Sequence, residues 1–157
     1  MGAWDTGIFD NDNAADFSGS MESCSDVEAR HDLLMATMGA VLERPIRPDE
    51  MTPDYEFGHE VEHALASAAY VADAKNGRHD FTDTSYAMQL VPDENLAENF
   101  EDPDAWSHID VGTPSPKLVE RAVLLVEKVL ITMVERGVDA EWREPSEKLL
   151  KALLEKS

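Results

Sequence analysis

The chain has 157 residues, of which 43% are hydrophobic, and its 33 acidic against 13 basic side chains give a formal net charge of −20. This acidic balance disfavours binding to nucleic acids or anionic membrane surfaces, because phosphate contacts need lysine and arginine. The single cysteine, Cys24, excludes an intramolecular disulfide and fits a reducing compartment, and the acidic N-terminus lacks the pattern of a secretion signal, so a cytoplasmic location is expected.

The N-terminal segment combines large apolar residues with turn-forming ones. It reads MGAWDTGIFDNDNAADF, and the run Asp10–Asn13 directly precedes a short predicted helix near residues 14–21. Trp4, Phe9 and Phe17 are too large and apolar to stay in solvent. We therefore expect this segment to dock on the core.

Two further helices are predicted in the first half of the chain. The capping box Ser25-Asp26-Val27-Glu28 begins one that runs to about Arg44. The next begins at Thr52-Pro53 and ends at Asn76-Gly77, and its small residues Ala64–Ala69 favour close helix packing. Both helices carry apolar side chains at helical spacing, which predicts that each buries one face.

Residues 78–114 are the least regular part of the chain. They contain Pro92, Pro103 and Pro114 and a dense acidic run from Asp93 to Asp104. This composition favours an irregular surface excursion of the same domain over a second domain.

The segment Pro116–Arg136 is the strongest helix candidate. Its apolar residues recur at i, i+3 and i+4 and cover most of the helix circumference, which predicts burial by neighbours on several sides. Ser115 is the expected N-cap, Pro116 suits the first turn, and Gly137 can supply a left-handed C-terminal cap.

A last helical region follows from Ala140, where Pro145 interrupts or restarts the helix and leucines pack one face toward the C-terminus. The sequence therefore predicts an all-α fold. We expect one domain spanning residues 1–157, an irregular bundle of four to five main helices around the central helix 116–136. The region 78–114 is its acidic excursion.

The N-terminal residues resemble the signature of a mainly bacterial family, domain of unknown function 4259, whose members begin roughly M-G-A-W-G-x-G-x-F-D-N-D-x-A-x-D-W. The most specific matches are Trp4, Gly7, Phe9, Asp10, Asn11, Asp12 and Asp16. Asp5 replaces the usual glycine and Phe17 the usual tryptophan. Later features are also similar, namely the alanine-rich middle helix, the Leu/Val-rich helix and Glu141-Trp142-Arg143. The resemblance implies an α-helical domain and supplies no known activity.

The pattern His59-Glu60-Val61-Glu62-His63 matches H-E-x-x-H, in which two histidines one helical turn apart bind zinc and the glutamate activates a water. A metal-dependent hydrolase that uses His59 and His63 as ligands and Glu60 as base is therefore the alternative function.

Two features weigh against this alternative. At about 100° per residue, His59 and His63 fall opposite the apolar face of their helix. Glu62 also places a charge where zinc hydrolases of this pattern have none. We therefore interpret the match as a solvent-exposed helix face and expect no cofactor.

The negative charge is unevenly placed. Residues 1–110 contain 25 acidic and 5 basic side chains, whereas residues 111–157 contain 8 of each. Such an asymmetry is typical of an acidic face that meets a basic partner, and solubility or adaptation to a salty cytoplasm is the alternative explanation. The expected contact residues are Glu94, Glu98, Glu101, Asp102, Asp104 and Asp110.

These observations favour a non-catalytic protein-binding module, of inhibitor or immunity type, for a basic protein partner. A structural or stress-related protein, whose charge serves only solubility, is a third possibility. The sequence does not determine the oligomeric state.

Overall fold

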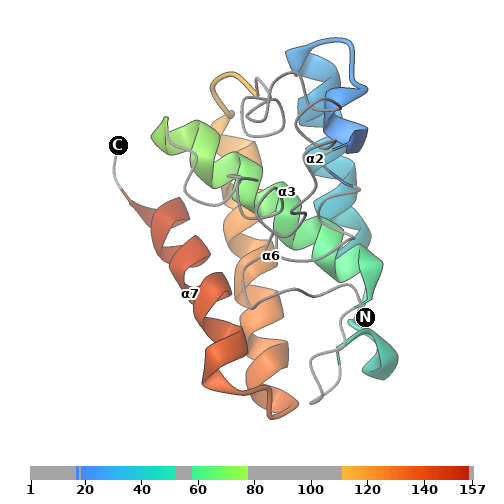
Figure 1. The fold of residues 1–157 in the computed structure, drawn as a ribbon, viewed down its shortest axis with the longest axis vertical. Coiled ribbons are helices and arrows are strands. Elements are labelled where there is room, and N and C mark those ends of the chain that lie inside the picture. Colours follow the sequence, from blue (N-terminus) through green and yellow to red (C-terminus); the bar gives the residue numbers. More distant parts are fainter. Residues whose placement is uncertain (1–16, 18, 52–57, 78–110, 156–157) are drawn as a thin grey trace, which may run out of the picture.

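Helices make up most of this computed structural model, which describes residues 17, 19–51, 58–77 and 111–155 (Figure 1). The long helices are α2 (Val27–Leu42), α3 (His59–Asn76), α6 (Pro116–Glu135) and α7 (Ala140–Leu154), and the short 3-10 helix η1 (Pro48–Glu50) precedes α3. These described ranges contain no strand, so the predicted all-α fold class is confirmed. Most of the predicted acidic excursion, residues 78–110, lies outside the described residues.

Three of the long helices lie side by side and the fourth, α3, crosses two of them. In Figure 1, α6 lies between α7 and α2, and α3 runs diagonally across the near side of α6 and α2, with its C-terminal end above the upper end of α7. The helix α6 contacts α2, α3 and α7, as its predicted central position requires. The helix α3 also contacts all the others, so two helices share the centre of the bundle.

Both ends of α6 form as the sequence predicts. The Ser115 hydroxyl accepts a hydrogen bond from the backbone N–H of Leu118 at 3.2 Å, and Pro116 is the first helical residue. At the other end Gly137 has φ 72°, and the Val138 N–H donates to the Met133 carbonyl at 3.0 Å. This is a Schellman motif, in which the left-handed residue turns the chain back over the last helical carbonyls.

Apolar residues cover more of the surface of α6 than the neighbouring helices bury. Leu125, Val126 and Val129 are fully buried, but Ile131 and Val134 are 59% and 60% exposed. Neighbouring helices cover the helix on the α3 side and on its two flanks, and the side turned away from α3 remains exposed. The expected burial on several sides of this helix therefore does not extend to Ile131 and Val134.

The helix α3 is buried around its whole circumference over residues 64–73. Alanines and Ser67 make up most of this stretch, and side chains this small let the surrounding chain approach closely from every side. Its C-terminal end at Asn76 and Gly77 agrees with the prediction, and Gly77 adopts the left-handed conformation with φ 65°. The predicted start near Thr52-Pro53 lies outside the described residues, and the observed N-cap is Gly58.

The start of α2 differs by one residue from the predicted capping box. The N-cap is Asp26, whose carboxylate accepts from the Ala29 N–H at 2.7 Å. An ionised carboxylate is a stronger acceptor than the Ser25 hydroxyl, and it also favours the positive end of the helix dipole. Phe17, which precedes α2, is 2% exposed, as expected for a residue docked on the core.

The helix α7 runs through Pro145 without a break. A proline inside a helix removes the hydrogen bond to the carbonyl four residues earlier. Here that carbonyl belongs to Glu141, which is exposed, so solvent can satisfy it. The predicted interruption is therefore wrong.

Basic side chains of α6 hold the end of α2 and the loop that follows it. The Lys128 ammonium donates to the carbonyls of Val41, at 2.7 Å, and of Arg44. The Arg136 guanidinium donates to the carbonyls of Arg47, at 2.7 Å, and of Ile46. A cation at a helix C-terminus complements the helix dipole and satisfies its last carbonyls.

Side chains also donate hydrogen bonds to backbone carbonyls at two other helix ends. Arg30 on α2 donates to the Met21 carbonyl at 3.0 Å, where the helical residues 19–22 end. The Asn76 amide, at the end of α3, donates to the Ala152 carbonyl of α7 at 3.1 Å, and the Lys75 ammonium donates to the Glu155 carbonyl. Much of the basic charge is therefore used inside the bundle.

Candidate functional site

The first turn of α3, which carries the H-E-x-x-H pattern, lies directly on η1. The Gly58 N–H donates to the Glu50 carbonyl at 2.8 Å. A β-carbon at position 58 would lie 3.2 Å from Cγ of Glu50, so a larger residue would push the two segments apart. This close contact brings Glu60 near the charged groups around η1.

Arg44 joins α2, η1 and α3 through a network of ion pairs. Its two terminal nitrogens bind both carboxylate oxygens of Glu50, at 2.6 and 2.7 Å, and one of them also binds Glu60 at 2.8 Å. The backbone N–H of Arg47 donates to Glu50 at 2.9 Å. Glu50 is only 4% exposed, so this is a largely buried, bidentate ion pair.

The network keeps both glutamates ionised. Hydrogen bonding from Arg44 lowers the pKa of Glu50 from 4.5 to about 2, although burial acts in the opposite direction. The same partner lowers the pKa of Glu60. A general base works best with a pKa near the working pH and a free lone pair directed at its proton. Glu60 is therefore a poor base in this arrangement.

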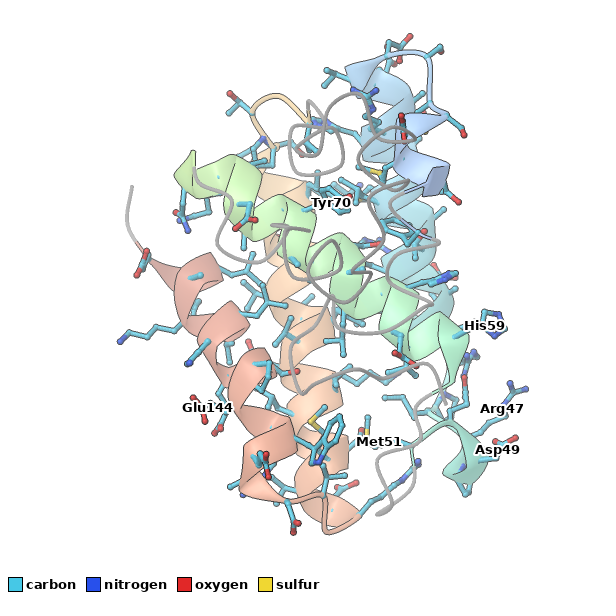
Figure 2. The ribbon with its side chains drawn as sticks, in the orientation of Figure 1. Arg47, Asp49, Met51, His59, Tyr70 and Glu144 are labelled. Atoms are coloured by element: carbon cyan, nitrogen blue, oxygen red, sulfur yellow. The ribbon has the colours of Figure 1, made fainter. Side chains whose placement is uncertain are left out.

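The two histidines differ in environment. His59 is exposed and projects from the start of α3 at the edge of the molecule (Figure 2). His63 is half-buried, with its ring centroid 5.7 Å from that of Phe17 and 5.7 Å from that of His59. The expectation of an exposed helix face is right for His59 and wrong for His63, because Phe17 packs against the latter.

The described geometry gives the hydrolase alternative no support. Within residues 19–51, 58–77 and 111–155, no group of three or more His, Cys, Asp or Glu side chains is arranged to hold a metal ion. His59 and His63 provide two imidazoles, and Glu60 is bound to Arg44. The chemistry that this cluster does show is ionic attachment of α3 to the preceding segments.

The other residues that the sequence singles out lie outside the described residues. They are the acidic contact candidates Glu94, Glu98, Glu101, Asp102, Asp104 and Asp110, and the signature residues Trp4, Gly7, Phe9, Asp10, Asn11, Asp12 and Asp16.

Acidic side chains of α2 remain exposed while the nearby basic ones are engaged. Glu28 and Asp32, one helical turn apart, are exposed and form no ion pair with any described residue. The basic residues described between positions 19 and 77 all bind carboxylates or backbone carbonyls: Arg30, Arg44, Arg47 and Lys75. Glu28 and Asp32 are therefore left without a basic partner among the described residues.

The sequence did not predict that two basic side chains near the centre and end of α6 would bind other segments of the bundle. Lys128 and Arg136 belong to the segment that is neutral by count, yet both donate to backbone carbonyls of other segments. The one signal in the sequence is the position of Lys128 beside the buried Val129, at the margin of the apolar face.

Among the described helices, none is both long and apolar enough to cross a membrane.

The fold and the charge pattern define a small, strongly acidic, all-α protein. A family model described as Domain of unknown function (DUF4259) matches residues 2–153, and the chain belongs to this family. The resemblance seen in the N-terminal residues is thereby confirmed. Searches of curated proteins and of solved structures found no match.

Proposed function

We propose that this protein is a non-catalytic binding protein, of inhibitor or immunity type, which neutralises a basic protein partner in the cytoplasm. The observation that supports this most is the division of charge in the described part of the chain. Basic side chains such as Arg30 and Lys128 hold helix ends in place, whereas acidic side chains such as Glu28 and Asp32 are exposed and form no ion pair with a described residue.

An exposed acidic surface of this kind attracts a cationic partner over a long range. Complementary charge speeds the encounter of two proteins and disfavours partners of like charge. The proposed contacts are the exposed acidic residues of α2 together with Glu94, Glu98, Glu101, Asp102, Asp104 and Asp110.

The ion pair between Arg44 and Glu60 supports the non-catalytic part of the proposal. A base must accept a proton from substrate or water, and Glu60 instead accepts hydrogen bonds from a guanidinium. Glu60 is the best candidate base among the described residues, and its ion pair with Arg44 gives it a structural role.

Capture from the native host tests this proposal. We expect the tagged full chain to recover a basic protein, and Glu28→Lys with Asp32→Lys to reduce the recovery. Glu141→Lys with Glu144→Lys on α7 is the matched control, because it changes the charge equally at exposed helical positions. Recovery of no basic protein, or equal loss with both double variants, would refute it.

A further inference from the structure

The exposed side of α6 carries large apolar residues. Leu124, Ile131 and Val134 are 52%, 59% and 60% exposed. They recur at intervals of seven and three residues, so they share one face of the helix. Large exposed apolar side chains that are grouped on one element mark interaction surfaces more often than scattered ones do.

Acidic residues lie beside and between these apolar ones on the same side of the helix. Glu120, Glu127 and Glu135 are exposed and form no ion pair with any described residue. We call these six residues the α6 stripe: Glu120, Leu124, Glu127, Ile131, Val134 and Glu135. It extends over about 22 Å at the 1.5 Å rise of an α-helix.

Lys117 is exposed in the first turn of α6, three residues before Glu120, and the other basic residues of the helix and its C-cap are directed away from the stripe. Lys128 and Arg136 donate to carbonyls around the end of α2 and the following loop. Arg121 is half-buried and reaches α2, since a β-carbon at Gly39 would lie 3.0 Å from its guanidinium. Apart from Lys117 at its N-terminal end, the stripe is therefore acidic and apolar, although its segment is neutral by count.

A shallow groove between α6 and α7 adds apolar surface on the α7 flank of α6. Leu130, Leu150 and Leu154 line it, with Glu147, Lys151 and Glu155 around them, and Leu154 is 62% exposed. Leucines surrounded mainly by acids suit a segment that presents apolar and basic side chains together.

We propose that the α6 stripe is a docking surface for a basic amphipathic helix of a partner protein. A helix with apolar residues at i, i+3, i+4 and i+7 can cover Leu124, Ile131 and Val134 and place flanking lysines or arginines beside the stripe's glutamates. The proposal rests on the proposed function, and it adds a second contact surface and the form of the partner's segment.

Charge argues against a second copy of this chain as the occupant. An antiparallel pair of α6 helices, centred between Ile131 and Leu124, would place Glu120 opposite Glu135 and bring the two copies of Glu127 together. Like charges directly opposed are destabilising, and each copy carries a net charge of −20. A basic helix meets the same residues with opposite charge.

Binding of a synthetic peptide to the full-length protein tests the inference. The probe is a fluorescein-labelled helix of about 18 residues, long enough to span the stripe, with leucines at i, i+3, i+4 and i+7 and lysines elsewhere. Its affinity is measured by anisotropy for the parent and three double variants. These are Leu124→Ser with Ile131→Ser, Glu120→Lys with Glu127→Lys, and Glu28→Lys with Asp32→Lys. All six positions are exposed, so the variants should fold, which circular dichroism checks.

We expect the two α6 variants to weaken binding by about tenfold or more, and the α2 variant, which changes the charge equally, to weaken it by about twofold or less. Absence of binding to the parent, or equal weakening by the two charge reversals, would overturn the inference. So would a dimer of the parent that Leu124→Ser with Ile131→Ser dissociates. Failure here leaves the proposed function standing if a basic protein is still captured from the host.

Discussion

At the scale of single residues, Arg44 determines the role of the H-E-x-x-H pattern. It binds Glu50 and Glu60, which are six and sixteen residues away along the chain. Neither separation corresponds to neighbours on one helix, so a sequence pattern cannot reveal the pairing. The sequence shows the two histidines at i and i+4. It does not show that Arg44 binds Glu60, the residue that would act as the base.

Glu50→Gln should lower the free energy of unfolding by about 2 kcal/mol at neutral pH. This loss is smaller than is usual for a fully buried ion pair, because Arg44 still binds Glu60 and is partly exposed to solvent. Urea unfolding measures this loss. Asp49→Asn is the control, since its side chain is 83% exposed and should change stability by less than about 0.5 kcal/mol.

The same ion pair predicts a dependence on pH. The folded-state pKa of Glu50 is lowered, so its contribution to stability is complete above about pH 4.5 and is lost as the pH falls toward 2. Between these values the parent should lose more stability than Glu50→Gln does. Parallel curves for the two proteins would contradict the account of the pair.

The third residue-scale prediction concerns zinc. With Glu60 bound to Arg44, the purified protein should contain no stoichiometric zinc. His59→Ala should melt like the parent, because this side chain is exposed. Elemental analysis that found one tightly held zinc per chain, lost when His59 and His63 are both replaced by alanine, would restore the hydrolase alternative.

At the scale of elements, the helices and their ends were largely predictable and their exposed sides were not. Ser115, Pro116 and Gly137 mark the ends of α6 through local hydrogen bonding and backbone conformation, which a sequence encodes directly. Which sides of α6 have neighbours depends on how α2, α3 and α7 pack around it. Periodicity alone therefore could not separate the buried Val126 from the exposed Val134.

Two adjacent leucines of α6 test which side of the helix is buried. Leu125→Ala should destabilise the protein by about 2–4 kcal/mol, since the side chain is fully buried and its loss leaves a cavity. Leu124→Ala, at a position that is 52% exposed, should cost about 0.5 kcal/mol or less. Thermal unfolding compares the pair, and similar losses at both positions would show that the exposed side of α6 is assigned wrongly.

Lys128→Met tests the capping of α2 by α6. The substitution keeps the apolar part of the side chain and removes the donor to the Val41 and Arg44 carbonyls, so we expect a loss of about 1–2 kcal/mol. Lys148→Met serves as control, because Lys148 is 68% exposed and forms only a surface ion pair with Glu144. If both variants unfold at the same urea concentration, the cap contributes nothing to stability.

At the scale of the whole molecule, the direction of charged side chains matters more than their count. The sequence places the net charge of −20 in residues 1–110 and makes the remainder neutral. The structure shows that basic residues in both parts, such as Arg30 and Lys128, are used to hold helix ends. Acid is therefore exposed on α2 and on α6 alike, an arrangement that depends on tertiary contacts and that counting residues cannot show.

The most direct test of the central claim, that the exposed acid binds a basic protein, is the rate of association with the captured partner at two ionic strengths. The Debye length falls from about 30 Å at 0.01 M to about 10 Å at 0.1 M, so a complex steered by charge should form much more slowly at the higher salt. Reversal of Glu94, Glu98 and Glu101 to lysine should slow association at low salt and reduce its salt dependence. A rate that ignores both salt and the three reversals would contradict the claim and leave solubility as the explanation of the charge.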